Sequence, residues 1–257
     1  MKRQVTFNTG DTMYHLEIDR ANPYVLSGGS PGRIKRMAEC LDHPEVIVSD
    51  RGLVTVHGEY GGLPITAFST GMGPASVSIV MPEIIEACDD PKMTILRLGT
   101  SGGLQKHLKI GDLVVTTDVE RAESTSDKIM HPGYKAVSDN DVRRVLEETA
   151  QEHKLPSQSV HVGRTKTTDD IYFDALASKG YKGPTLAVSM EFSVYCALRD
   201  RYNRDFEKEI RVGEVLMISD IVVAEEHPDM TEFLANKKEI EAAHIKIGLE
   251  ALLRLAR

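Results

Sequence analysis

The sequence predicts one α/β domain that spans residues 1–257 and is built on a central mixed β-sheet flanked by helices. Two observations predict this fold class. Short apolar runs rich in Val, Ile and Thr alternate with longer amphipathic stretches, which is the alternation of strands and helices expected in α/β proteins. The 257 residues, of which 41% are hydrophobic, can bury one large core, and no repeat, low-complexity segment or long linker divides them.

Eight apolar runs predict the strands of the sheet. The stretch 51–70 contains two of them, because the turn GEYGG (58–62) separates two apolar halves. The other six strands are predicted at 23–29, 94–100, 111–118, 159–165, 185–191 and 213–220. Since ligands of such folds bind at the carboxyl edge of the sheet, polar residues at the ends of these runs are candidates for a site.

Three longer stretches predict helices. Residues 74–88 begin with a proline, which suits the first turn of a helix. Residues 138–153 start at a capping residue, either Ser138 or Asp139. Residues 231–257 carry apolar side chains at i, i+4 and i+7, the spacing of one helix face.

The composition excludes some classes of partner. The net charge of -8 argues against nucleic acid and favours a small-molecule substrate. The N-terminal segment has no apolar signal core, and no apolar run approaches the roughly 20 residues that span a bilayer, so we expect no membrane association. Cys40, Cys88 and Cys196 are sparse and far apart, which is typical of reduced thiols and predicts a cytoplasmic protein.

A charged residue interrupts one of the predicted buried strands. Arg97 lies in the run ILRLGTSGG (95–103), and a buried arginine is costly unless it is paired. Taken alone, Arg97 favours an ion pair with an internal carboxylate. Arg33, however, follows a second strand end, GGSPGR (28–33), at the start of a helix, and Thr100 adds a hydroxyl next to Arg97. Taken alone, GGSPGR is equally consistent with a plain strand-to-helix turn whose Arg33 is solvated. Two arginines at two strand ends together favour an anion site.

Three other residues are candidates, each with a plainer structural alternative. Met72 stands between two glycines and could pack against a flat or sugar ligand, or fill the core. Glu191 ends the run 185–191 and suits two neighbouring sugar hydroxyls, or stabilises a helix N-terminus. Asp220 ends the run 213–220 and could donate a proton at a cleft, or be an ordinary turn aspartate.

Neither His15 nor the histidine-containing segment 225–229 indicates a functional site by itself. His15 alone is more consistent with a structural or surface role. The segment EEHPD (225–229) has no second ligand group at a suitable spacing, so it predicts a solvated loop and no metal site. No Ser-His-Asp or Cys-His nucleophile pattern is readable.

Together these segments resemble the nucleoside phosphorylase family, which contains the hexameric purine nucleoside and uridine phosphorylases. The matching segments follow the family order along nearly the whole chain: YHLEI (14–18), GGSPGRIKRM (28–37), STGMGPASVSI (69–79), RLGTSGG (97–103), TTDDIYF (167–173) and SMEFSVY (189–195). Three positions depart from the family pattern. Ser30 replaces an aspartate, Ser189 replaces a glutamate, and Ile171 stands where an aromatic residue is common.

The resemblance implies a role for each matching residue. Phosphate would be bound by Gly29, Arg33, Arg51, Arg97 and Thr100; ribose by His15, Met72, Met190 and Glu191; and the base by Ser101, Gly102, Ile171 and Asp220. Arg97 and Asp220 would carry the catalysis. The family implies no metal and no cofactor, because phosphate is a co-substrate.

The resemblance also implies the fold, the assembly and the reaction. The sheet would curl towards a barrel. The chain would form a dimer-based homo-oligomer, a hexamer arranged as a trimer of dimers, in which His15 and Arg51 reach a neighbour's site. Phosphate would attack the anomeric carbon of a nucleoside and release the free base and ribose 1-phosphate.

Fewer residues indicate which base the substrate carries than indicate the type of reaction. The pair Ser219–Asp220 matches the SD pair with which the purine enzymes protonate the base, so a purine nucleoside is narrowly favoured. The segment IYFDALASKG (171–180) lacks the Gln and Arg with which uridine enzymes read uracil, although YHLEI and GGSP resemble that branch. Uridine phosphorylase proper, a hydrolytic nucleosidase and a non-catalytic nucleoside-binding relative remain the alternatives.

Overall fold

The computed structural model describes residues 4–223 and 231–257. The segment 225–229, for which the sequence predicts a solvated loop, lies outside these residues. Within them, no helix has both the length and the apolar character needed to cross a membrane.

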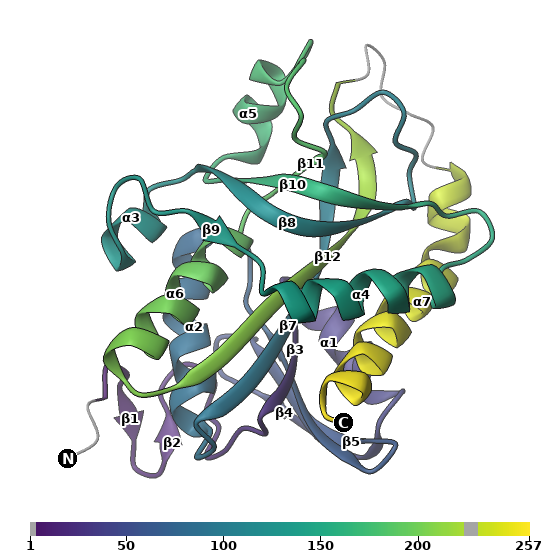
Figure 1. Ribbon diagram of the computed structural model, residues 1–257. Coiled ribbons are helices and arrows are strands. Elements are labelled where there is room, and N and C mark those ends of the chain that lie inside the picture. Colours follow the sequence, from purple (N-terminus) through teal and green to yellow (C-terminus); the bar gives the residue numbers. More distant parts are fainter. Residues whose placement is uncertain (1–3, 224–230) are drawn as a thin grey trace.

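One large mixed sheet organises the described residues (Figure 1). Its strands run in the order β11-β10-β8-β12-β7-β3-β6-β5-β4, with β9 paired to β8. Their bounds are β3 Tyr24–Gly28, β4 Asp42–Val48, β5 Val54–Tyr60, β6 Leu63–Ser69, β7 Lys92–Gly103, β8 Leu113–Ala122, β9 Ala136–Val137, β10 Val160–Thr168, β11 Ala187–Ser189 and β12 Glu209–Ile221. A small separate hairpin is formed by β1 (Asn8–Thr9) and β2 (Thr12–Met13).

A pairing between β11 and β7 closes part of this sheet on itself. Ala187 pairs with Gly103 and Val188 with Gly102, in antiparallel register. The strands β7, β12, β8, β10 and β11 therefore form a closed barrel, and β3, β6, β5 and β4 extend the sheet beyond β7. The predicted α/β fold with a mixed sheet that curls towards a barrel is confirmed.

Helices cover both faces of the sheet. Their bounds in the described residues are α1 Pro31–Ala38, α2 Pro74–Ala87, α3 Thr125–Ile129, α4 Asn140–His153, α5 Ile171–Ala177, α6 Phe192–Asp205 and α7 Thr231–Leu255. Figure 1 shows α4 and α7 on one side of β12 and β7, and α2 and α6 on the other. The buried apolar residues divide in the same way, into one cluster under α2 and α6 and another under α1, α4 and α7.

The three predicted helices are present as α2, α4 and α7, whereas the strands β1, β2, β4 and β9 and the helices α3, α5 and α6 were not predicted. All eight predicted strands are present; β7 and β12 are longer than predicted, and β11 is shorter. Asp139, not Ser138, caps α4, since its carboxylate accepts hydrogen bonds from the backbone N–H groups of Asp141 and Val142. Helix α6 was not predicted, because its first turns are apolar all round and buried, and so lack the one-sided spacing that reveals a surface helix.

Parallel strands bring the candidate residues to one edge. Strands β6, β3, β7 and β12 are successively parallel, so their carboxyl ends meet at the same edge of the sheet. The loop before α1, the loop before α2 and the ends of β7 and β12 therefore converge there.

Candidate active site

A cavity of about 860 Å³ opens at this edge. All the residues predicted for the site line it except His15 and Arg51: Gly29, Arg33, Met72, Arg97, Thr100, Ser101, Gly102, Ile171, Met190, Glu191 and Asp220. The structure thus brings together residues from the whole length of the chain that the sequence singled out one by one.

Arg97 is held in place by the pairing of two long strands. It lies on β7, directly opposite Glu214 of the parallel strand β12. Gly99, two residues further along β7, makes room for the guanidinium, because a Cβ at this position would overlap Arg97 Nη1. This close approach explains why a glycine follows the arginine in the RLG segment.

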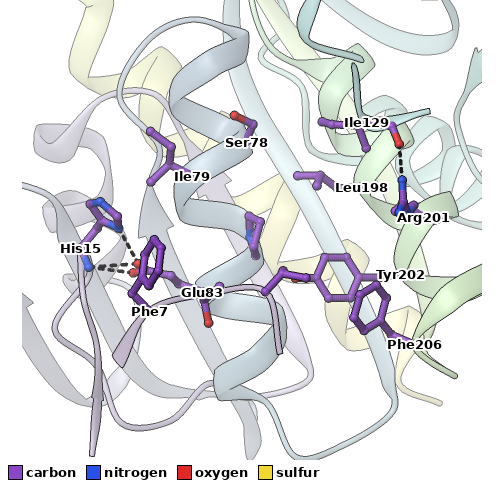
Figure 2. A pocket seen from close by; sticks show the side chains of 13 residues that line it. Phe7, His15, Ser78, Ile79, Glu83, Ile129, Leu198, Arg201, Tyr202 and Phe206 are labelled. Carbon is purple, nitrogen blue, oxygen red and sulfur yellow. Dashed lines mark hydrogen bonds and ion pairs between the residues drawn. The ribbon is translucent and has the colours of Figure 1, made fainter. Parts of the chain in front are cut away.

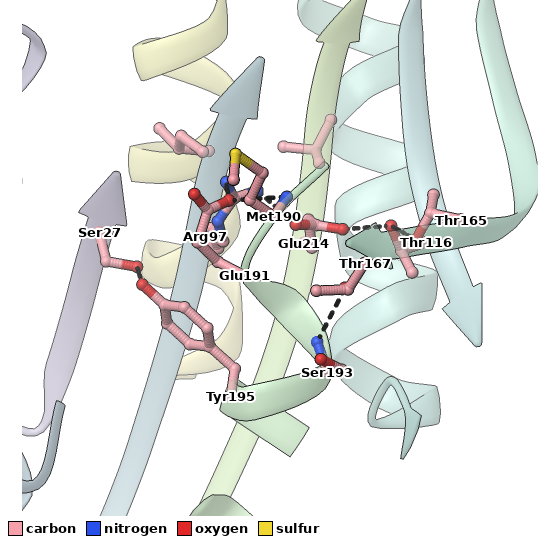
Figure 3. A network of polar contacts seen from close by, with 12 residues as sticks. Ser27, Arg97, Thr116, Thr165, Thr167, Met190, Glu191, Ser193, Tyr195 and Glu214 are labelled. Carbon is pink, nitrogen blue, oxygen red and sulfur yellow. Dashed lines mark hydrogen bonds and ion pairs between the residues drawn. The ribbon is translucent and has the colours of Figure 1, made fainter. Parts of the chain in front are cut away.

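Arg97 makes the internal ion pairs that the sequence analysis considered as the alternative to an anion site. Its Nη1 donates to Glu214 Oε1 at 2.5 Å, and its Nη2 donates to Glu191 Oε2 (Figure 3). Arg97 is 3% exposed. Burial by itself lowers the pKa of Arg97, but the carboxylates of Glu191 and Glu214 outweigh that effect and raise it, so the guanidinium is charged. Arg97 is therefore compensated within the chain and also faces the cavity.

Glu191 is the second partner of Arg97 and lies where β11 passes into α6. The sequence places it at the end of a strand, but β11 ends at Ser189 and Glu191 precedes the first residue of α6. Its side chain does not cap that helix; its Oε1 accepts a hydrogen bond from the N–H of Gly73 at 3.1 Å. The backbone of Gly73 has a φ of 90°, which glycine adopts readily.

Arg33 reaches the cavity from the first turns of α1. It is buried, and its Nη1 donates to the carbonyl of Leu98 at 2.8 Å. Its Nε lies 3.8 Å from Glu241 on α7, and the same carboxylate contacts Arg36 at 2.7 Å. Burial lowers the pKa of Arg33, an effect that Glu241 opposes.

Several buried polar groups that belong to residues lining the cavity have no hydrogen-bond partner in the described part of the chain. They are the Nε atoms of Arg33 and Arg97 and the hydroxyls of Ser101 and Ser189. Buried donors without partners are rare, because each costs about 1–3 kcal/mol. Two guanidinium N–H groups and two hydroxyls of this kind therefore lie in the residues around one cavity.

The lining of the cavity also combines a carboxylate with apolar surface. Asp220 lies on β12 just after a register shift between Ile218 and Asp220, and such a bulge turns a side chain out of the regular alternation. Ile171, at the start of α5, and Met72 are both well exposed and line the same cavity. These two positions suit contacts to the flat or apolar parts of a ligand.

Some residues of the site were not predicted. Lys179 and Tyr172 line the cavity, and neither occupies a strand end that would have revealed it. Glu214 contacts Arg97 from the interior of β12. The sequence does indicate Glu214, because a carboxylate inside an apolar run needs a partner just as Arg97 does in the adjacent strand.

His15 and Arg51 lie away from the cavity. The His15 Nδ1 is 2.6 Å from Glu83 Oε1, and the residue borders a second cavity of about 400 Å³ between α2 and α6 (Figure 2). The ring of Tyr14 joins the two residues, with the His15 ring centroid at 4.9 Å and the Arg51 guanidinium at 5.9 Å. They therefore share one surface of the chain, separate from the main cavity.

In the parts of the chain that the structure describes, no group of three His, Cys, Asp or Glu side chains could hold a metal ion.

Comparisons with known proteins agree with this geometry. A guanosine phosphorylase of Halorubrum lacusprofundi is 29% identical over 249 residues, which are 94% of this chain and 98% of that protein. A uridine phosphorylase of Haemophilus influenzae is 30% identical over 179 residues, 66% of this chain and 69% of that protein.

Solved structures share the fold. The purine nucleoside phosphorylase from Toxoplasma gondii in complex with immucillin-H superposes with a TM-score of 0.80 at 23% identity, covering 97% of this chain and 98% of that one. A uridine phosphorylase from Vibrio fischeri gives a TM-score of 0.78 at 22% identity, covering 95% and 96%.

A family model described as the phosphorylase superfamily matches residues 23–254, which is nearly the whole chain. The chain with this closed sheet therefore belongs to the phosphorylase superfamily.

Proposed function

We propose that this chain is a nucleoside phosphorylase, a pentosyltransferase that uses phosphate to cleave the N-glycosidic bond of a nucleoside. The observation that carries the proposal is the grouping, around one cavity, of two arginines and two carboxylates: Arg33, Arg97, Glu191 and Asp220. Membership of the phosphorylase superfamily supports it. The products are the free base and ribose 1-phosphate.

Each group has a task in this reaction. Arg33, Arg97 and Thr100, with the backbone at Gly29, hold the phosphate whose oxygen attacks the anomeric carbon. The sugar becomes positively charged as the bond to the base breaks, and Glu191 accepts hydrogen bonds from its hydroxyls. Met72 and Met190 pack against the ribose.

The departing base needs its own stabilisation, because negative charge builds on it. Asp220, as a general acid, donates a proton to the base, and Ser101, Gly102 and Ile171 line its place. No cofactor is required, since phosphate is the co-substrate. The nucleophile is the phosphate itself, so no covalent enzyme intermediate is needed.

A purine nucleoside is the substrate that we favour. Asp220 is placed in the cavity, where it can serve a purine. The relative that aligns with 94% of this chain is a guanosine phosphorylase. Uridine is the second candidate, because a uridine phosphorylase is 30% identical over 66% of the chain.

We further propose that Arg51 of a neighbouring subunit supplies a cation to the phosphate, with His15 beside it reaching the neighbour's ribose, in a dimer-based homo-oligomer that we take to be a hexamer. Arg51 and His15 lie outside the cavity of their own chain and share one surface through Tyr14, which supports sites shared between subunits.

The cellular setting follows from the composition. Cys40, Cys88 and Cys196 are free thiols, as in proteins of reducing compartments, and we place the enzyme in the cytoplasm. The net charge of -8 supports a role with small molecules and not with nucleic acid.

A substrate panel tests the proposal. The pure protein is incubated with inosine, guanosine or uridine, with and without inorganic phosphate, and base release is followed by chromatography. We expect release only with phosphate, and faster from a purine nucleoside. Release that ignores phosphate would indicate a hydrolytic nucleosidase, and binding of nucleosides without release would indicate a non-catalytic relative.

A further inference from the structure

The two carboxylates that contact Arg97 are of different kinds (Figure 3). Glu214 is fully buried and does not line the cavity. It is fixed opposite Arg97 by the register of β12 and β7, and its Oε2 accepts a hydrogen bond from Thr116 at 2.6 Å. Glu214 is therefore a permanent partner, because both of its oxygens and its backbone are held by the sheet.

Glu191 is held less firmly and faces the ligand space. It lines the cavity and lies between β11 and α6, outside both elements. Apart from Arg97, its carboxylate contacts only backbone N–H groups among the described residues, those of Gly73 at 3.1 Å and Met190 at 3.2 Å. Glu191 can therefore leave Arg97 without breaking the sheet.

The Arg97–Glu191 pair occupies groups that both substrates need. In the proposed reaction, phosphate takes the guanidinium of Arg97 and the ribose hydroxyls take the carboxylate of Glu191. While these two side chains contact each other, Arg97 Nη2 and Glu191 Oε2 are both engaged. Neither substrate can use its full set of contacts until the pair has opened.

We propose that the Arg97–Glu191 ion pair couples the binding of phosphate to the binding of the nucleoside. The inference rests on the proposed function. Whichever substrate binds first bears the cost of opening the pair, and the second then binds to groups that are already free. By linkage, each substrate raises the affinity for the other by the same factor.

Glu214 lowers the free energy needed to open the Arg97–Glu191 pair. Removing one partner from a buried ion pair is strongly unfavourable when it leaves a charge uncompensated. Arg97 keeps Glu214 when Glu191 leaves, so the guanidinium remains paired and stays beside the cavity.

Calorimetry of the full chain measures the coupling. The probes are guanosine and inorganic sulfate, a tetrahedral dianion that replaces phosphate without turnover. Guanosine is titrated at increasing sulfate, with chloride keeping the ionic strength constant. We expect saturating sulfate to lower the dissociation constant of guanosine by about 5- to 150-fold, the usual range for coupled sites.

Two matched variants separate the coupling from a simple change of charge. Glu191→Gln and Glu214→Gln each remove one carboxylate from Arg97. Glu191→Gln should reduce the effect of sulfate to nearly none, because the ion pair no longer has to open. Glu214→Gln should keep it, because Glu191 still pairs with Arg97. Circular dichroism checks folding, and Glu191→Ala replaces the glutamine variant should that one not fold.

Three results would overturn the inference: no effect of sulfate on guanosine binding to the wild-type protein, full coupling in Glu191→Gln, or lost coupling in Glu214→Gln. These outcomes are separate from the fate of the proposed function. A protein that releases base with phosphate but shows no coupling loses only this inference. A protein that releases no base with phosphate loses the proposed function.

Discussion

Asp220 is the residue from which we infer a preference for purine nucleosides. It lines the cavity from the end of β12, beside the bulge that follows Ile218. A carboxyl group at this place can protonate a departing purine on its imidazole ring, whereas uracil has no equivalent ring nitrogen to receive a proton. The residue therefore has an assigned role with one class of base only.

We predict that Asp220→Asn slows the cleavage of guanosine strongly and spares that of uridine. Loss of a general acid typically reduces the rate by about 10²–10⁴-fold. The measurement is kcat for both nucleosides at saturating phosphate. Ser219→Ala, which removes the hydroxyl of the neighbouring residue, is the matched control and should affect the two substrates alike. Equal losses for Asp220→Asn on both nucleosides would remove its assigned role.

Single residues also show what the sequence could and could not predict about the site. Arg97 stood out because a cation in an apolar strand demands a partner, and it lines the cavity. Its contacts to Glu191 and Glu214 could not be predicted, because the partner of a buried charge depends on strand register and on the path of the chain between β11 and α6. Lys179 was missed because nothing in its local sequence marks it.

Among the elements, α7 depends on one buried histidine that faces the sheet. His244 is 1% exposed, and its Nε2 lies 3.1 Å from the carbonyl oxygen of Val215 on β12. Burial, aided by the charges of Arg33 and Arg97, lowers the pKa of His244 to about 3 from its ordinary value of 6.5. The imidazole is therefore neutral in the folded protein and donates to the carbonyl.

This burial makes stability depend on pH in a defined direction. Between about pH 6.5 and about pH 3, the unfolded chain binds a proton at residue 244 that the folded chain does not bind. The free energy of unfolding must then fall as the pH falls through this window. We predict that His244→Gln loses less stability than the wild type between pH 7 and pH 5, as measured by urea denaturation. If the wild type and His244→Gln lost equal stability between pH 7 and pH 5, the result would contradict this account.

The elements also show where sequence patterns stop being informative. Turn glycines predicted the strands around Gly58 to Gly62, and capping residues limited the start of α4 to Ser138 or Asp139, of which Asp139 is the cap. These features depend on neighbours in sequence. The closure of β11 onto β7 joins residues 102–103 to 187–188, and only the family resemblance predicted a barrel. Long-range pairing leaves no mark in a local window.

At the scale of the whole molecule, the main cavity uses only part of the predicted set of residues from its own chain. His15 and Arg51 lie together on another surface, joined through Tyr14. A symmetric dimer can bring such a surface to the partner's cavity twice, once for each site.

We predict that two impaired variants restore each other's activity. Arg51→Ala and Asp220→Asn are each expected to cleave guanosine slowly. When they are co-expressed, a mixed dimer contains one site with both native residues and one with neither. Random pairing should then recover roughly a quarter of the wild-type rate. A rate no higher than the mean of the two parents, or full activity of a monomer in sedimentation, would refute sites shared between subunits.

The short pairing of β11 with β7, which we call the seam, has a consequence for local opening of the structure. Only two residue pairs close the barrel there, whereas β7 and β12 pair along almost their full length. Local opening requires least free energy where the fewest hydrogen bonds break, so deuterium should enter the backbone amides of this seam before those of the other barrel strands. Because Gly102 and Val188 both line the cavity, a bound nucleoside should slow that uptake on the two strands together.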